Sequence, residues 1–323
     1  RQFLYGKRFF REEFGVDNEI LWLPDVFGYS AALPQIMKKC GIRYFMTTKI
    51  SWNETNKMPN DTFMWQGIDG TKILTHFICA RDYNAASNSE NKKRPAHFTT
   101  YNGDLNPSQI KGTWKRYSQK SLNDSALICY GYGDGGGGAT SDMLENQRRI
   151  ARGIPGCPQT KASTALQFFR HLEKEVREKR ELPLWVGELY LEYHRGTYTS
   201  MARNKKYNRQ SEFLLHNIEM LSVINAWNSG SSYPREKLEE LWKTVLKNQF
   251  HDILPGSGIR EIYEDSRREY EQVLKEGCAL RMHEMEQAAA EVNAEEGELI
   301  IFNQNGFKAS DYVYVESPAD VSL

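Results

Sequence analysis

Hydrophobic and polar positions change their spacing along the chain at about residue 200. Before it, short apolar runs alternate with stretches of helical periodicity, which is typical of an α/β layer or barrel. Strands are expected at residues 20–23, 44–48, 73–79 and 126–130, and helices at residues 30–40, 107–121 and 141–153. The polar stretch 85–94 is expected to be an exposed loop.

The second part of the chain has a different pattern. Apolar residues recur at three- and four-residue spacing in residues 208–226, 234–249 and 258–292, which predicts a bundle of three helices. Residues 297–323 alternate apolar and polar positions around an Asn-Gly turn, which predicts a hairpin. Because an isolated hairpin is marginally stable in water, we expect these strands to begin a larger β-domain.

Composition narrows the classes of function. The 42 basic and 42 acidic residues give a net charge of zero, which removes the usual electrostatic argument for a nucleic-acid or anionic-membrane partner. No apolar run approaches the roughly 20 residues that cross a bilayer. The five cysteines are odd in number and form no C-x-x-C pair, so a reducing compartment fits better than a disulfide framework or a thiolate zinc site.

One carboxylate stands at a place where barrel enzymes keep catalytic groups. An apolar run over residues 20–23 reaches Pro24 and Asp25, and Gly28 then opens a turn into a helical pattern. In a βα unit of a barrel, the residue at the carboxyl end of the strand faces the active site. An Asp after a Pro is also common as a helix cap or turn residue, so spacing alone leaves both interpretations open.

The string WLPDVFGYSAALPQI, residues 22–36, resembles the nucleophile segment of the family 38 glycoside hydrolases, the retaining α-mannosidases, and especially of their bacterial-type members. The resemblance implies that Asp25 attacks the anomeric carbon and binds a zinc ion. A second string, KNQFHDILPGSGI, resembles a distant motif of the same family. It implies that His251 binds zinc and that Asp252 holds substrate hydroxyls, whereas a lone His-Asp pair at a helix end is usually structural.

Asp134 precedes four glycines in GYGDGGGGAT. Such a loop could cradle a phosphate, but it lacks a following GKS or GKT and does not match G-x-G-x-x-G. A flexible turn that contains an Asp is the other alternative. The resemblance implies instead that Asp134 is the general acid and base. The glycines would let the backbone pass close to a sugar, and a like-charged neighbour such as Asp25 would favour a protonated Asp134.

Further residues are assigned through the same resemblance. Lys49 follows the second predicted strand and would reach the catalytic carboxylate or the substrate, although a solvated loop lysine is the alternative. Residues 187–209 match the family's connecting segment, in which His194 and Tyr198 are candidates for contact with the sugar. His76 has no partner at ligand spacing, and we interpret it as a packed histidine.

The zinc ligands are incomplete in this sequence. Family members bind zinc with two Asp and two His, and these oxygen and nitrogen donors suit Zn²⁺. Asp25 and His251 would account for two, and the others belong to a His-x-Asp motif on the first barrel strand. None of the seven histidines has an Asp two positions later. We therefore expect a central fragment without that strand or most of the C-terminal β-domain, which by itself is inactive or nearly so.

The resemblance implies an α/β fold in three parts. Residues 1–185 would form part of a seven-stranded (β/α) barrel, residues 186–293 a three-helix bundle that contributes to the active site, and residues 294–323 the first strands of a β-sandwich. The implied function is that of a retaining, zinc-dependent α-mannosidase that hydrolyses terminal α-mannosidic bonds through a covalent glycosyl-aspartate. The implied partners are a mannose-containing oligosaccharide and a second copy of the full-length enzyme, in the cytoplasm. The alternatives are a zinc-dependent carbohydrate deacetylase and a degenerate carbohydrate-binding protein.

Overall fold

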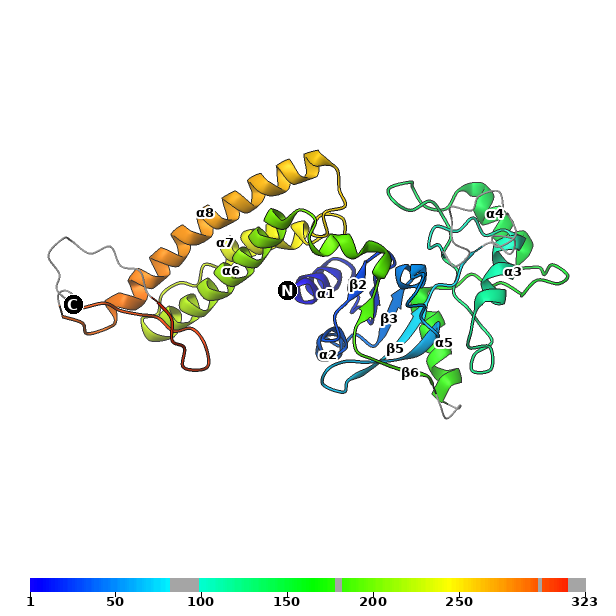
Figure 1. Cartoon of the computed structure of the whole chain (residues 1–323), viewed down its shortest axis with the longest axis horizontal. Coiled ribbons are helices and arrows are strands. Elements are labelled where there is room, and N and C mark those ends of the chain that lie inside the picture. The colour runs from blue at the N-terminus through cyan, green and yellow to red at the C-terminus, as the bar shows by residue number, and fades with distance from the viewer. Residues whose placement is uncertain (82–98, 178–181, 296–297, 313–323) are drawn as a thin grey trace. The chain divides into compact units, whose positions relative to one another are not determined.

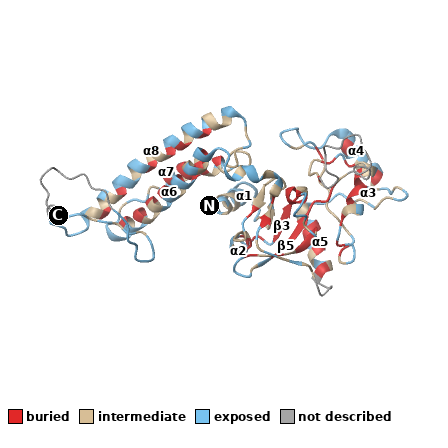
Figure 2. Cartoon of the chain, viewed as in Figure 1, coloured by how far each residue is buried: buried red, intermediate tan, exposed pale blue. Residues whose placement is uncertain are grey.

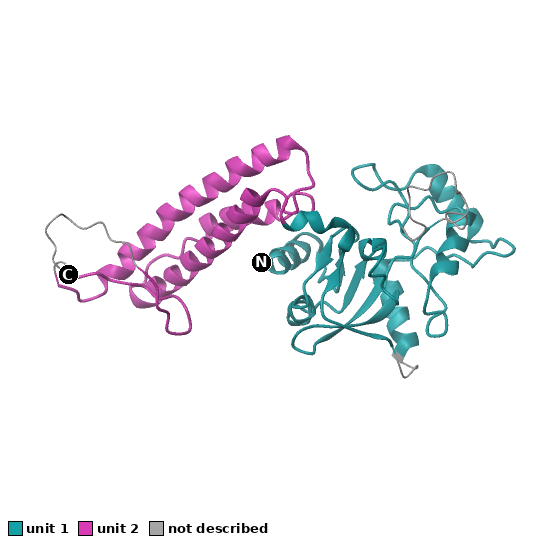
Figure 3. Cartoon of the chain, viewed as in Figure 1, with its two compact units in different colours: residues 1–198 teal, residues 199–323 magenta. Residues whose placement is uncertain are grey.

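The computed structural model describes residues 1–81, 99–177, 182–295 and 298–312. The chain divides into two compact units, residues 1–198 and 199–323 (Figure 3). The loop predicted at residues 85–94 lies outside the described part of the chain. Among the described helices, none is long and apolar enough to cross a membrane.

Unit 1 is built on a mixed five-stranded sheet with the order β1-β3-β5-β4-β6. Figure 1 labels β3, β5 and β6 of this sheet. Parallel pairing joins β1 (Ile20–Trp22), β3 (Tyr44–Thr47) and β5 (Lys72–Phe77). The next strand, β4 (Thr62–Gln66), runs antiparallel to β5, and β6 (Leu184–Val186) runs parallel to β4. A second sheet pairs β2 (Gly28–Tyr29) with β7 (Leu189–Tyr190).

Both faces of the five-stranded sheet are covered. One face packs Phe45, Phe63 and Trp65 into one apolar cluster, and the other face packs Tyr44 and Leu74 against the buried side of helix α5 (Ala165–Arg177). Figure 2 shows β3 and β5 as the most continuously buried strands. This burial on both sides explains why the strands of the sequence are apolar runs without alternation.

Unit 1 has six further helical elements among its described residues, of which the first precedes β1 and the last follows β7. They are α1 (Gln2–Phe14), α2 (Leu33–Lys39), η1 (Lys49–Trp52), α3 (Pro107–Arg116), α4 (Ser141–Ile150) and η3 (Glu192–Tyr198). Side-chain caps start two of them, since Asn106 accepts from the Gln109 amide and Thr140 from the Met143 amide. The predicted helices at 30–40, 107–121 and 141–153 therefore exist in shortened form.

The strand predicted at residues 126–130 is wrong. This segment forms only an isolated bridge between Tyr130 and Gly103. Its backbone groups have other partners, because the Leu127 amide donates to Nε2 of His76 and the Cys129 carbonyl accepts from the Gly103 amide. The strand β4 was not predicted, since most of its residues are buried and it shows no polar alternation.

Unit 2 consists of α6 (Ala202–Asn228), α7 (Arg235–Asn248) and α8 (Arg260–Ala290), each of which packs against the other two. The helices predicted at 208–226, 234–249 and 258–292 are confirmed. Residues 298–312 contain no strand, and the rest of the predicted hairpin lies outside the described residues. The Asn303 side chain instead accepts from the Asn305 amide and donates to the Phe307 carbonyl, which makes a local turn without paired strands.

Candidate active site

The carboxyl ends of β1 and β3 bring Asp25 and Lys49 together. The Lys49 amide donates to the Pro24 carbonyl at 3.1 Å, so the two segments stay adjacent beyond the last paired residues of the strands. The Lys49 ammonium forms an ion pair with Oδ1 of Asp25, and the two side chains are 9% and 17% exposed. A solvated loop lysine is therefore excluded, because Lys49 is buried as the counter-ion of Asp25.

Tyr101 joins the two predicted catalytic carboxylates. Its hydroxyl lies 2.8 Å from Oδ2 of Asp25 and 3.1 Å from Oδ1 of Asp134. These two distances mean that Oδ2 of Asp25 and Oδ1 of Asp134 lie at most about 6 Å apart, which is below the spacing typical of inverting glycosidases. Burial, and then the two carboxylates, raise the pKa of Tyr101 well above its usual value, so this phenol remains a hydrogen-bond donor.

The glycine-rich loop presents Asp134 through an unusual backbone conformation. Asp134 has a φ of 53°, in the left-handed region that few residues other than glycine adopt. Its second carboxylate oxygen accepts from Nδ2 of Asn102 at 3.0 Å. A Cβ at Gly133 would lie 2.1 Å from Oδ1 of Asn102, so any larger residue there would displace the Asn102 side chain from Asp134. The loop is thus held by residues 101 and 102, and the phosphate-binding interpretation finds no support in these contacts.

Aromatic rings surround the ion pair. The Lys49 ammonium lies 3.8 Å from the centre of the Trp52 ring, and the Phe27 ring stacks on His194 with centres 4.5 Å apart. The Trp52 indole donates to the Thr99 carbonyl at 3.0 Å, which fixes the ring. His194 therefore stands next to the segment that carries Asp25. Tyr198, four residues later, is 61% exposed.

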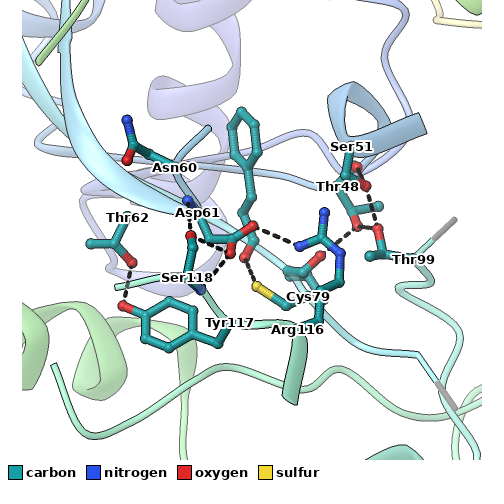
Figure 4. Close-up of polar contacts among 12 residues, drawn as sticks. Thr48, Ser51, Asn60, Asp61, Thr62, Cys79, Thr99, Arg116, Tyr117 and Ser118 are labelled. Atoms are coloured by element: carbon teal, nitrogen blue, oxygen red, sulfur yellow. Dashed lines mark hydrogen bonds and ion pairs between the residues drawn. The ribbon is translucent and has the colours of Figure 1, made fainter. Parts of the chain in front are cut away.

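A hydroxyl cluster fixes the backbone on both sides of Lys49. The Thr99 hydroxyl contacts the hydroxyls of Thr48 and Ser51 at 2.7 and 2.5 Å, and the Thr48 hydroxyl reaches the Ile78 carbonyl (Figure 4). Since Tyr101 follows Thr99 by two residues, the same contacts hold the segment that carries Tyr101. Lys49, which follows β3, and Tyr101 both contact the Asp25 carboxylate, and the hydroxyl cluster fixes the backbone of both.

Glu192 caps the loop that follows η1. Its carboxylate accepts from the backbone amides of Glu54, Thr55 and Asn56, and these bonds lower the pKa of Glu192. The Asn53 side chain completes the link, because it donates to the Tyr190 carbonyl and accepts from the Glu192 amide. The segment with His194 and Tyr198 is therefore anchored to the loop after Lys49.

Two family models together match most of the chain. Residues 1–188 match the glycosyl hydrolases family 38 N-terminal domain, and residues 192–288 match the alpha mannosidase middle domain. The chain belongs to glycosyl hydrolase family 38.

Individual relatives support the same assignment. Alpha-mannosidase G of Dictyostelium discoideum is 45% identical over 277 residues, which are 85% of this chain and 23% of that protein. Alpha-mannosidase 2C1 of Homo sapiens is 40% identical over 281 residues, which are 87% of this chain and 25% of that protein. The chain thus spans about a quarter of the length of these curated relatives.

A solved family structure shares the fold. The crystal structure of an alpha-mannosidase from Enterococcus faecalis V583 matches with a TM-score of 0.67 and 18% sequence identity. The match covers 89% of this chain and 31% of that chain.

The second family 38 motif lies in unit 2, directly after α7. Nε2 of His251 lies 3.6 Å from Oδ2 of Asp252, and the Phe250 ring contacts the imidazole. Oδ1 of Asp252 accepts from the Ser257 hydroxyl at 2.7 Å, and the Tyr263 hydroxyl donates to the Asp252 carbonyl. These two hydrogen bonds hold the segment that contains Pro255 and Gly256 against Asp252, and His251 immediately precedes Asp252.

Sequence reasoning missed Tyr101, Asn102 and Trp52, which contact Asp25, Asp134 and Lys49 in the candidate site. Tyr101 and Asn102 open the string YNGD after a polar stretch, and such a string looks like an ordinary turn. Trp52 lies only three residues after Lys49, so the position of Lys49 could have pointed to it. No linear spacing relates residue 101 to residues 25 and 134, because their contact depends on the fold.

Proposed function

We propose that this chain forms part of a retaining α-mannosidase in which Asp25 is the nucleophile and Asp134 the general acid and base. The observation that carries the proposal is the shared contact of both carboxylates with the Tyr101 hydroxyl. A retaining enzyme needs carboxyl groups about 5 to 5.5 Å apart, and an inverting one needs about 6.5 to 9.5 Å. The limit of about 6 Å on one oxygen pair favours the retaining mechanism.

The proposed reaction then has two steps. Asp25, held by Lys49 and Tyr101, attacks the anomeric carbon while Asp134 gives its proton to the leaving oxygen. In the second step Asp134 takes a proton from water, which attacks the glycosyl-aspartate and releases the sugar with its original configuration. Lys49 and Tyr101 stabilise the Asp25 carboxylate again as it departs.

The substrate contacts are proposals of the same kind. His194 stacks on Phe27 beside Asp25 and offers an imidazole face to a sugar ring. Tyr198 is exposed four residues away, and Lys49 and Asp252 would bind hydroxyl groups. We propose a terminal mannose of an oligosaccharide as the group that these side chains hold.

Zinc dependence rests on the donor types that this chain supplies. The Asp25 carboxylate and the His251 imidazole are both common zinc ligands. Within the described residues, neither belongs to a group of three His, Cys, Asp or Glu side chains whose donor atoms lie close enough to share a metal ion. A bound zinc ion would orient sugar hydroxyls, and no step above depends on it.

The division of the chain into three structural parts is also a proposal. We propose that residues 1–185 belong to a seven-stranded (β/α) barrel, residues 186–293 to a three-helix bundle and residues 294–323 to a β-sandwich. The strand order of unit 1 has β1 and β6 at its two ends, so the described strands alone do not close a barrel. A cytoplasmic enzyme that assembles as a homodimer is proposed from the family resemblance.

The test is hydrolysis of an aryl α-mannoside by the 323-residue chain and by the complete gene product, each with Asp25→Asn and Asp134→Asn. We expect Asp25→Asn to abolish hydrolysis, since no nucleophile remains. Asp134→Asn should keep a residual rate with an activated phenol, which departs without a proton, and lose it with an alkyl mannoside. Proton NMR of the first product should show α-mannose.

Three outcomes would contradict the proposal. Release of β-mannose as the first product would indicate inversion, and normal hydrolysis by Asp25→Asn would remove its assignment as nucleophile. Release of acetate from an acetylated sugar without mannoside hydrolysis would favour the deacetylase. Sugar binding by the complete gene product without any hydrolysis would favour the degenerate binding protein.

A further inference from the structure

Three side chains of types that can bind a metal ion meet on the surface of unit 1. His171 and Glu175 are one turn apart on α5, and Asp124 comes from the loop after α3. One donor atom from each of the three lies within 4.8 Å of the others. A search of the described residues for three or more His, Cys, Asp or Glu side chains that could share a metal ion finds this group.

The spacing of the first pair fits zinc. Nε2 of His171 lies 3.4 Å from Oε1 of Glu175. Zinc binds imidazole nitrogen and carboxylate oxygen at about 2.0 to 2.2 Å, so two donors of a tetrahedral site lie roughly 3.4 Å apart. The pair therefore already has the separation of two zinc ligands. Asp124 needs only a small side-chain movement to complete three protein ligands.

Both backbones that carry the ligands are fixed by packing. Leu172 and Val176, which adjoin His171 and Glu175 on α5, are buried in the apolar cluster on one face of the sheet. On the other side, Asn123 is fully buried, and its side chain contacts the Tyr117 hydroxyl at 3.0 Å and accepts from the Ser125 hydroxyl. A metal ion would thus join two segments that are already held, with little loss of conformational entropy.

We propose that Asp124, His171 and Glu175 form a zinc site that clips the loop after α3 to α5, with water completing the coordination. Two carboxylates and one neutral imidazole balance the charge of a divalent ion and combine donors that suit zinc better than calcium or magnesium. The site is independent of the proposed hydrolysis and of the Asp25 and His251 ligands.

The experiment titrates the metal-free 323-residue chain with ZnCl₂ against a chromophoric chelator. The variants are His171→Asn and Glu175→Gln, with His216→Asn as an exposed control on α6 and His251→Asn as the control for the second family motif. We expect one zinc equivalent whose affinity falls more than about tenfold in the first two variants. That equivalent should be unchanged in both controls. Zinc should also raise the melting temperature of the native chain and the controls more than that of His171→Asn.

Cobalt gives a second readout that does not depend on stability. Co²⁺ in the same site should show a visible absorption band that His171→Asn removes and His216→Asn retains. The proposal is overturned if the native chain binds no zinc, or if His171→Asn and Glu175→Gln bind it as the native chain does. It is equally overturned if the zinc equivalent disappears only in His251→Asn.

Discussion

At the scale of single residues, the candidate active site depends on two side chains that touch Asp25. Lys49 neutralises one carboxylate oxygen and Tyr101 binds the other. Lys49 is buried and Tyr101 is half-buried, so the ion pair with Lys49 is stronger than it would be at the surface. Asp134 is exposed by comparison, and its contact with Tyr101 is what ties it to Asp25.

Replacement of Tyr101 by Phe should lower kcat/KM for an aryl α-mannoside about 10- to 100-fold, the range expected for one hydrogen bond to a charged group. The ring remains, so the melting temperature should change little. Steady-state kinetics of the complete gene product measure the effect, with Tyr312→Phe as a control because this tyrosine is 91% exposed. An unchanged kcat/KM would show that the bridge between the carboxylates has no catalytic role.

Replacement of Lys49 by Met should destabilise unit 1 by about 3 kcal/mol, because it leaves the Asp25 carboxylate without its counter-ion in a mostly buried position. The double variant Lys49→Met with Asp25→Asn should recover much of this loss, since no charge then remains unpaired. Urea unfolding of the three variants measures the coupling. If the double variant is as unstable as the sum of the single ones, the ion pair contributes nothing.

At the scale of elements, a buried ion pair explains where α3 ends. Asp61, just before β4, pairs with Arg116 at 2.6 Å, and it accepts from the amide and the hydroxyl of Ser118 (Figure 4). The Tyr117 hydroxyl bonds to Thr62 at 2.8 Å, and the backbone of Tyr117 has left the helical region. The periodicity of residues 107–121 predicted a longer helix, but these contacts with β4 stop it at Arg116.

Asp61→Asn should lower the free energy of unfolding by about 3 kcal/mol, because Arg116 stays charged and largely buried without a partner. The double variant Asp61→Asn with Arg116→Met should regain part of the lost free energy of unfolding, because no buried charge is then unpaired. Glu145→Gln is a matched control, since that carboxylate pairs with Arg149 on the exposed face of α4 and should change stability by less than about 1 kcal/mol. Equal effects of Asp61→Asn and Glu145→Gln would contradict the role given to the buried pair.

At the scale of the whole molecule, stability should depend on pH through His76. The sequence interpretation of His76 as a packed histidine is confirmed, because it is fully buried and its ring contacts Phe168. Burial lowers the pKa of His76 from 6.5 to about 4. Between these values the unfolded chain binds a proton that the folded chain does not, so the free energy of unfolding falls as the pH falls.

The expected loss is roughly 2 kcal/mol between pH 7 and pH 5, and about 3 kcal/mol by pH 4. Urea unfolding at several pH values measures it, and His76→Gln should remove this part of the slope even though that variant is less stable at pH 7. His216→Asn is the control, since His216 is exposed. Native and His76→Gln chains with the same slope from pH 6.5 to pH 5 would contradict the prediction.

The sequence by itself determined the elements that local physics controls. Apolar runs gave β1, β3 and β5, and the three- and four-residue spacing gave α6, α7 and α8, since burial imposes these periods directly. The motifs around Asp25 and in residues 247–259 led to family 38 because many consecutive residues matched. Asp25 and Lys49 were also within reach, as both follow parallel strands that pair side by side.

Only the tertiary structure decided the contacts between distant segments. The bridge from Asp25 through Tyr101 to Asp134 joins residues 25, 101 and 134, and the possible metal ligands Asp124, His171 and Glu175 meet across about fifty residues. The failure of a strand at 126–130 has the same origin, because its backbone groups bind His76 and Gly103. Local patterns record which residues prefer burial or a given conformation, whereas these contacts depend on which surfaces the folded chain brings together.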